Sequence, residues 1–217
     1  MIESEIVSGW YTAQKGDCIS SIAFKNGFFW QTLWDDPKNA DLRKLRKDPN
    51  VLAEGDSVFI PDLRKATEDC PTDAQHSFVL KGVPAKLKLR LLVNKQPRKN
   101  VPYTLIIDGK SFKGQTDSDG RLEQPIPPDA SQGKLVIVSN GVTEEHALVL
   151  GDLDPLDKNT GIKDRLVNLG YACDTDSDAM TDKFRQALSD FQADNKLPQT
   201  GEPDAATQQK LQQLHGF

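Results

Sequence analysis

The segment that decides the fold of the C-terminal third reads Ile162-Lys163-Asp164-Arg165-Leu166-Val167-Asn168-Leu169-Gly170-Tyr171. Ile162, Leu166 and Leu169 recur at i, i+4 and i+7, the spacing that places apolar side chains on one face of an α-helix. Gly170 follows directly, and glycine is the residue that most often stands just past a helix end. The segment therefore predicts an amphipathic helix that buries one face against a partner.

Two more helices are predicted downstream from the same kind of evidence. Phe184, Leu188 and Phe191 repeat the spacing. Asp204 can cap a last helix, which carries Leu211 and Leu214 and is stopped by Gly216. Because an amphipathic helix must bury its apolar face against another element, the C-terminal third predicts a three-helix unit.

This third of the chain resembles the small helical peptidoglycan-binding domain that accompanies many wall hydrolases. The resemblance rests on three blocks of residues: Arg165 to Tyr171; Phe184 with Ala187 to Gln192; and Leu197 to Asp204 with Thr207 and Leu211. The family's glycine-rich loop before the second helix is replaced here by Asp174 to Met180. The resemblance implies peptidoglycan binding, with Tyr171 either lining the ligand groove or completing the core.

The N-terminal third predicts a strand, two helices and a second strand. Gly9 to Gln14 alternates as a strand does, and Asp17 can cap a helix over Cys18–Lys25. Phe28–Trp34 supplies a second helical turn, and Leu52–Pro61 contains a turn that feeds a strand. The residues between, 35–48, form a charged stretch. The three tryptophans, Trp10, Trp30 and Trp34, are expected in the core rather than on a sugar-binding platform.

These residues resemble a LysM module. Its first half matches from Tyr11 to Ala23 and its second half from Leu52 to Pro61, and Gly-Asp occurs in both. The family usually has threonine where Cys18 stands. The middle, 37–50, is longer than in a typical cell-wall LysM and resembles the variant found in phage and contractile-injection proteins.

The LysM resemblance implies a shallow glycan groove between two loops. The implied groove residues are Gly16, Asp17, Cys18, Ile19, Asn50, Val51 and Leu52. In the family, N-acetyl groups pack on an apolar floor and backbone groups hydrogen-bond the acetamide. The alternative is that the glycine and aspartate only build the turn and the cap.

The middle third predicts strands. Leu87, Leu89, Leu91 and Val93 alternate with mainly basic residues, as in an amphipathic strand. Asp108-Gly109, after an apolar run, predicts a hairpin turn. About six short strands suggest a small β-sandwich, loosely similar to prealbumin-like or bacterial Ig-like spacers. The fold class is therefore α+β multidomain: a βααβ module (1–66), a β-sandwich (67–152) and a three-helix domain (153–217).

Composition limits the function. The chain has 217 residues, with 27% charged and 37% hydrophobic residues, as in a globular protein. Lys and Arg number 27 against 32 for Asp and Glu, so the net charge is −5 and we expect no nucleic-acid partner. No apolar run is long enough to span a bilayer, so we expect no membrane insertion. The acidic start, Met1–Ile6, does not read as a secretory signal, which predicts synthesis in the cytoplasm.

No catalytic, metal or cofactor site is predicted. Cys18, Cys70 and Cys173 lie far apart, which argues against a disulfide framework and fits a reducing compartment. Cys70 and His76 are the nearest thiol–imidazole pair, and no family signature surrounds them. Asp174, Asp176 and Asp178 resemble half of a calcium loop but lack its glycine and its terminal glutamate.

The sequence as a whole predicts a non-enzymatic protein that binds peptidoglycan or a chitin-like glycan at the bacterial cell envelope. The alternative is a protein–protein adaptor of a contractile injection machine, with spike or baseplate proteins as partners and only vestigial glycan binding. A wall hydrolase is excluded for want of a nucleophile, a metal set or a carboxylate pair. If the protein acts at the wall, we expect it to leave the cytoplasm by a non-Sec route.

Overall fold

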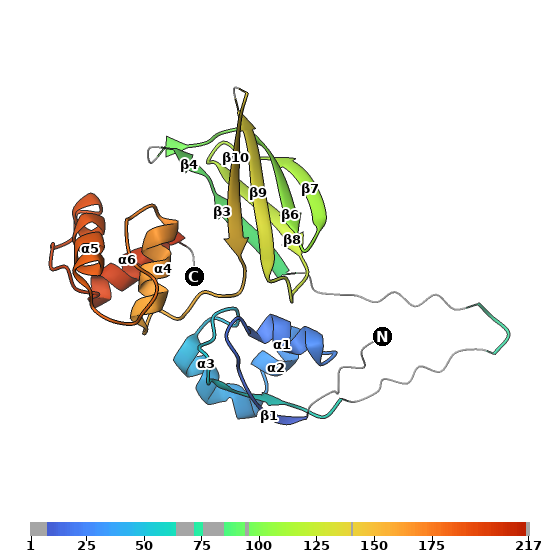
Figure 1. Cartoon of the computed structure of the whole chain (residues 1–217). Coiled ribbons are helices and arrows are strands. Elements are labelled where there is room, and N and C mark those ends of the chain that lie inside the picture. The colour runs from blue at the N-terminus through green and yellow to red at the C-terminus, as the bar shows by residue number, and fades with distance from the viewer. Residues whose placement is uncertain (1–7, 64–71, 76–84, 94–95, 140, 216–217) are drawn as a thin grey trace.

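The computed structural model describes residues 8–63, 72–75, 85–93, 96–139 and 141–215 (Figure 1). Cys70, His76 and the first seven residues lie outside this described part of the chain. Helices and strands are both present, which confirms a mixed α and β protein. Buried apolar residues gather in three clusters, which define an N-terminal unit (8–63), a β unit (85–150) and a C-terminal unit (159–215). The predicted boundaries at 66 and 152 stay predictions.

The N-terminal unit is a two-stranded antiparallel sheet covered by short helices. Its elements are β1 (Gly9–Thr12), α1 (Ile19–Lys25), α2 (Trp30–Trp34), the 3-10 helix η1 (Pro37–Asn39), α3 (Ala40–Arg46) and β2 (Ser57–Ile60). β1 and β2 pair with Trp10 opposite Phe59. The two predicted strands and two helices are confirmed. The prediction was incomplete over 35–48, where the charged stretch forms η1 and α3.

The core of the N-terminal unit forms between the helices and the inner face of the sheet. Ile19, Ile22, Leu33, Val58 and Ile60 are all 1% exposed or less. Trp30 and Trp34 pack against this cluster, as expected. Trp10 is 62% exposed and makes a T-shaped contact with the Phe59 ring, so the expectation that it lies in the core was wrong. Side chains alternate between the two faces of a strand, and Trp10 lies on the outer face of β1.

The β unit consists of short antiparallel strands around one apolar cluster. Its elements are β3 (Ala85–Arg90), β4 (Leu92–Val93), β5 (Gln96–Pro97), β6 (Pro102–Ile107), β7 (Lys110–Gln115), β8 (Arg121–Ile126), β9 (Gln132–Ser139) and β10 (Val142–Val149). One sheet has the order β10-β9-β6-β7, and β3 pairs with β8. Leu122 of β8 shares a cluster with Leu105 and Leu135 of the larger sheet, so the predicted packed strands are confirmed. The likeness to prealbumin or Ig-like spacers stays a prediction.

The hairpin predicted at Asp108-Gly109 joins β6 to β7. Ile107 pairs with Lys110, and both turn residues have positive φ, 44° and 80°. This is the backbone that a two-residue type I′ turn requires.

The C-terminal unit is the predicted three-helix arrangement. Its helices are α4 (Asn159–Asn168), α5 (Asp182–Asp194) and α6 (Ala205–His215). Gly170 follows α4 with φ +91°, and the Tyr171 N–H donates to Leu166 O at 2.9 Å, as in a glycine-ended helix. The Asp204 carboxylate accepts the Thr207 N–H at 2.8 Å, which confirms the predicted cap of α6.

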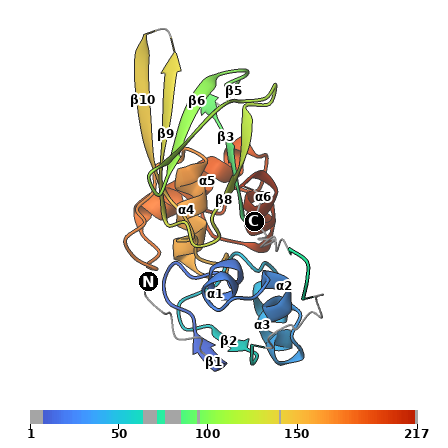
Figure 2. The ribbon, with the colours of Figure 1, turned by 90° about the vertical axis from the view of Figure 1, so that its right-hand side faces the viewer.

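The segment Gly151–Lys158, which we call the connector, runs between the three units (Figures 1 and 2). It leaves the end of β10 and enters α4. It contacts the N-terminal unit on the way, as described below. Among the helices of the described part, none has the length and apolar character needed to cross a bilayer.

Candidate functional site

The two loops of the N-terminal unit implied as a glycan groove lie side by side. We call residues 14–20 and 48–54 the loop pair. The Ile19 N–H donates to Pro49 O at 2.8 Å, and the Ser20 hydroxyl donates to Asn50 Oδ1 at 3.0 Å. The first bond fixes the start of α1 against the second loop. It also means that the Ile19 N–H already has a partner within the protein.

The seven implied groove residues divide into a buried floor and an exposed rim. Ile19 is fully buried, Val51 and Leu52 are each 7% exposed, and Cys18 and Asp17 are buried as well. Gly16 and Asn50 are exposed. Ile19 has no exposed surface, so the part of the implied groove that a ligand can reach consists of Gly16, Asn50 and the small exposed parts of Val51 and Leu52.

The helix cap predicted at Asp17 is supplied by its neighbour. Cys18 is the N-cap of α1: its sulfur accepts the Ser21 N–H at 3.3 Å, and the Ser21 hydroxyl accepts the Cys18 N–H at 3.0 Å. The expectation for Asp17 was therefore wrong by one residue. A reciprocal pair of this kind satisfies two backbone donors at the helix start.

The Asp17 carboxylate instead holds the turn in front of the helix. It accepts the Gln14 N–H at 3.0 Å and the Tyr11 hydroxyl at 2.7 Å, and it pairs with Lys25 at 3.0 Å. Burial favours a higher pKa for Asp17, but the Gln14, Tyr11 and Lys25 contacts outweigh it and the pKa falls below its ordinary value. The role of Asp17 in the fold is thus structural.

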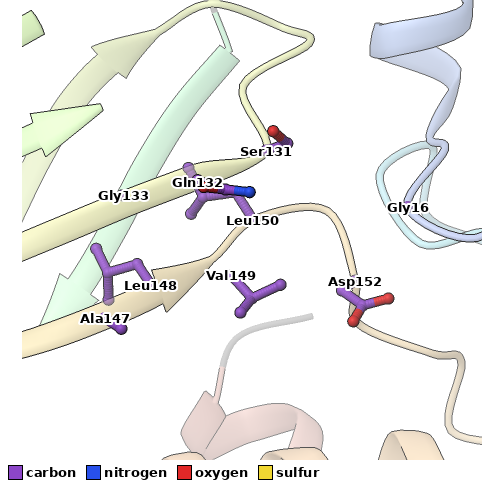
Figure 3. Close-up of a pocket in the computed structure, with 9 residues that line it drawn as sticks. All are labelled: Gly16, Ser131, Gln132, Gly133, Ala147, Leu148, Val149, Leu150 and Asp152. Atoms are coloured by element: carbon purple, nitrogen blue, oxygen red, sulfur yellow. The ribbon is translucent and has the colours of Figure 1, made fainter. Parts of the chain in front are cut away.

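The connector faces the loop pair at its Gly16 end. Lys15 Nζ lies 3.4 Å from the Asp152 carboxylate. A cavity of about 60 Å³ separates the connector from Gly16 and Leu52. A wider open hollow of about 420 Å³ adjoins it, bounded by Gly16, Asp152 and the ends of β9 and β10 (Figure 3). Among the described residues that line the larger hollow, Asp152 alone is ionisable, so these residues offer no acid–base pair.

Arg46 was missed by the sequence reasoning, and it joins the N-terminal unit to the connector. Its side chain is 8% exposed and bonds Asp56 through Nε at 2.7 Å and Nη2 at 2.8 Å. Its Nη1 reaches both Asp157 oxygens, at 3.0 and 2.9 Å. The bonds to Asp56, and to a smaller extent those to Asp157, raise the pKa of Arg46 above its ordinary value. Because the pairing crosses from one unit to the connector, no local sequence signal identifies it.

Tyr171 lies where α4 ends, with its ring against the core of the C-terminal unit. The ring meets Phe191 edge-on at 5.5 Å, and the hydroxyl donates to Asp194 at 2.9 Å. Burial first, and then the Asp194 bond, raise the pKa of Tyr171 to about 12. These contacts fit the reading in which Tyr171 completes the core, and the structure leaves its role as a groove residue a prediction.

Gln192 is a second residue whose role was missed, although it stands in a block that carries the family resemblance. Its amide is fully buried and bonded on both sides. Nε2 donates to Thr200 Oγ1, Glu202 O and Thr207 Oγ1 at 2.9 to 3.0 Å, and Oε1 accepts the Gly201 N–H at 2.9 Å. One side chain therefore fixes the loop between α5 and α6.

The ionisable side chains give no sign of metal chemistry in the described ranges: no group of three or more His, Cys, Asp or Glu residues is arranged to hold a metal ion. In the half-calcium-like loop, Asp174 bonds the buried Lys163 at 3.0 Å and the Thr181 hydroxyl at 2.6 Å. Asp174 is therefore engaged within the fold.

Comparison with known proteins gives one family match. Residues 160–211 match the family described as a peptidoglycan binding domain. No curated protein and no solved structure matches the chain significantly. The matched range begins within α4 and ends within α6, so it spans the three helices and their shared core. The chain thus contains a peptidoglycan-binding type of domain at its C-terminal end.

Proposed function

We propose that this chain is a non-enzymatic peptidoglycan-binding protein of the bacterial cell envelope. The observation that carries the proposal is the family match over 160–211, on a three-helix unit whose core is complete. The unit has its own helix cap at Asp204 and its own buried hydrogen-bond network at Gln192, so it is built as a complete folded unit.

The N-terminal unit contributes a second glycan site on this proposal. It is a LysM-type module whose loop pair takes an N-acetylglucosamine-containing glycan. Support comes from the adjacency of the two loops and from the buried floor of Ile19, Val51 and Leu52 beside exposed Gly16 and Asn50. Shallow sites bind weakly, and two of them on one polymer gain avidity when both can reach it.

The test of this function is co-sedimentation with purified peptidoglycan sacculi. We expect the full chain to sediment with sacculi and to release no soluble muropeptides above a heat-denatured control. Protein that stays in the supernatant would contradict peptidoglycan binding. Released muropeptides would contradict the non-enzymatic part alone.

A second candidate is the adaptor of a contractile injection machine. The observation that favours it lies in the lengthened middle of the N-terminal unit. There α3 supplies Arg46, which contacts another part of the chain rather than solvent. The same unit exposes large apolar side chains, including Trp10 (62%), Phe29 (51%) and Leu45 (58%). Co-purification with spike or baseplate proteins, without retention on sacculi, would support this function over the first.

A further inference from the structure

The outer face of the two-stranded sheet in the N-terminal unit carries one aromatic pair and two hydroxyl side chains. Side chains alternate between the faces of a strand, and the register places Trp10 opposite Phe59 and Thr12 opposite Ser57 on this face. We call these four residues the outer face. Trp10, Thr12 and Ser57 are exposed, and Phe59 is half-buried. In both views β1 lies at the end of the N-terminal unit that is remote from the β unit (Figures 1 and 2).

Phe59 is fixed by its neighbours, and it sets the position of Trp10. The buried Asn39 side chain donates to Phe59 O at 2.9 Å and accepts the Phe59 N–H at 2.7 Å. Lys38 Nζ lies over the Phe59 ring, 3.8 Å from its centroid. The Trp10 and Phe59 ring centroids are 5.5 Å apart at an interplanar angle of 67°, a favourable T-shaped geometry. The indole is therefore held against Phe59 while most of it stays open to solvent.

The surroundings of the aromatic pair are polar. The core of the unit lies on the other face of the sheet, where Val58 and Ile60 are fully buried. On the outer face, the hydroxyl groups of Thr12 and Ser57 follow the aromatic pair along the two strands, and the exposed Lys38 brings an ammonium group to it. Ligand sites combine aromatic side chains with a few polar groups that fix the orientation of the ligand. The outer face has this composition.

A sugar ring has the matching chemistry. The C–H faces of a pyranose are apolar and stack on an aromatic ring, and its hydroxyl groups hydrogen-bond to side chains such as Thr12 and Ser57. Peptidoglycan joins such rings to stem peptides that carry carboxylates, which complement the charge of Lys38. An apolar protein surface laid on Trp10 would instead bury these polar groups without partners, which costs free energy.

We propose that the outer face binds peptidoglycan by stacking one sugar ring on Trp10, with Lys38 facing a carboxylate of the stem peptide. This proposal rests on the peptidoglycan binding proposed above and adds a contact to it. The outer face and the loop pair have no residue in common, so a substitution in one leaves the side chains of the other in place. Trp10, which was expected in the core, is the platform of this contact.

The experiment follows the three tryptophan indole N–H signals of the full ¹⁵N-labelled chain. The probes are the neutral N-acetylglucosamine tetramer and the anionic disaccharide-peptide that a muramidase releases from sacculi. We expect both probes to move the Trp10 signal and to leave the signals of Trp30 and Trp34, which pack against the core, in place.

Two exposed aromatic side chains give a matched pair of variants. Trp10→Ala should weaken both probes about fivefold or more, measured on the amide signals of Thr12 and Phe59. Phe29→Ala removes another exposed ring of the same unit, 51% exposed, and should bind both probes as wild type does.

Lys38→Gln separates the two roles open to that lysine. We expect it to weaken the disaccharide-peptide and to leave the tetramer affinity unchanged, because only the former carries a carboxylate. Equal weakening of both probes would show that Lys38 acts only by packing on Phe59, and would overturn its role toward the stem peptide.

Two results would overturn the sugar platform. One is a Trp10 signal that neither probe moves, and the other is a Trp10→Ala variant that binds both probes as tightly as wild type. Wild-type protein that still sediments with sacculi would then leave peptidoglycan binding by the C-terminal unit standing. Wild-type protein that also stays in the supernatant would contradict the proposed function itself.

Discussion

Asp17 and Asp56 hold two turns of the N-terminal unit in the same way. The Asp17 carboxylate accepts the Gln14 N–H at 3.0 Å, and the Asp56 carboxylate accepts the Ala53 N–H at 2.8 Å, three residues back in each case. Both carboxylates are buried, and each bonds a base. The two Gly-Asp pairs of the sequence, Gly16-Asp17 and Gly55-Asp56, therefore form the same kind of turn.

Replacing Asp17 with Asn should destabilise the N-terminal unit by about 1.5–3 kcal/mol, the range for hydrogen bonds to a charged group. The amide loses the charge that faces Lys25 and can no longer accept from every donor around it. All three tryptophans lie in this unit, so tryptophan fluorescence in urea reports its unfolding alone. Asp41→Asn is the control, since that side chain is 97% exposed. Equal midpoints for the two variants would contradict the role given to Asp17.

The same carboxylate predicts an acid limit to stability. The folded pKa of Asp17 lies below its ordinary value of 3.8. The unfolded state therefore takes up the proton first as pH falls, and the stabilisation is complete above 3.8 and is lost as pH falls through the folded pKa. We expect the urea midpoint followed by tryptophan fluorescence to fall below pH 4, and to fall less in Asp17→Asn. Parallel curves for wild type and variant would contradict this assignment.

Cys18 is a helix cap made with a weak acceptor. Serine and threonine are stronger caps than a thiol, and replacing a cap by alanine costs about 1 kcal/mol. Because the thiol is the weaker cap, we expect Cys18→Ala to lower the stability of the N-terminal unit by no more than about 1 kcal/mol, and Cys18→Ser to hold or raise it. Urea unfolding by tryptophan fluorescence measures both. A serine variant less stable than the alanine variant would show that burial of the sulfur matters more than the cap.

Replacing Gly161 with alanine should destabilise α4, although Gly161 lies within that helix. Alanine gains about 1 kcal/mol of helix propensity over glycine. A Cβ here would lie 2.3 Å from two backbone oxygens of the connector, which cannot move aside as a side-chain end can. We expect the clash to win, with faster hydrogen exchange in α4 of Gly161→Ala. Slower exchange would show that the connector does not rest on α4.

The helices of the C-terminal unit were predictable because each signal is local. The stripe Ile162, Leu166 and Leu169 and the caps at Gly170 and Asp204 act within one or two turns of chain. The position of α1 was predicted correctly, but its N-cap was assigned to Asp17 instead of Cys18. Asp17 and Cys18 are adjacent, and only the backbone geometry decides which side chain reaches the Ser21 N–H.

The features that the sequence did not predict depend on contacts between distant residues. α3 was not predicted because most of its residues are charged and Leu42 is its one buried residue. The Arg46–Asp157 pair joins positions 111 residues apart, and the connector reaches Gly16 only through the packing of the units. The two loops of the implied groove were expected together from resemblance, whereas the close contact of Gly151 with Gly16 was not.

The central claim is that the C-terminal unit binds peptidoglycan. Gln192→Met is the substitution that most directly weakens the fold of that unit, because it leaves the buried Gly201 N–H without its acceptor, at about 1–3 kcal/mol, and removes the Nε2 donor from Thr200, Glu202 and Thr207. Gln186→Met makes the same change on the exposed face of the same helix.

Co-sedimentation of the three full-length proteins with purified sacculi is the most direct measurement. We predict that wild type and Gln186→Met sediment with sacculi, and that Gln192→Met loses most of its binding while tryptophan fluorescence shows a folded N-terminal unit. Wild-type protein that stays in the supernatant, or a Gln192→Met variant with an unfolded C-terminal unit that binds as well as wild type, would contradict the claim.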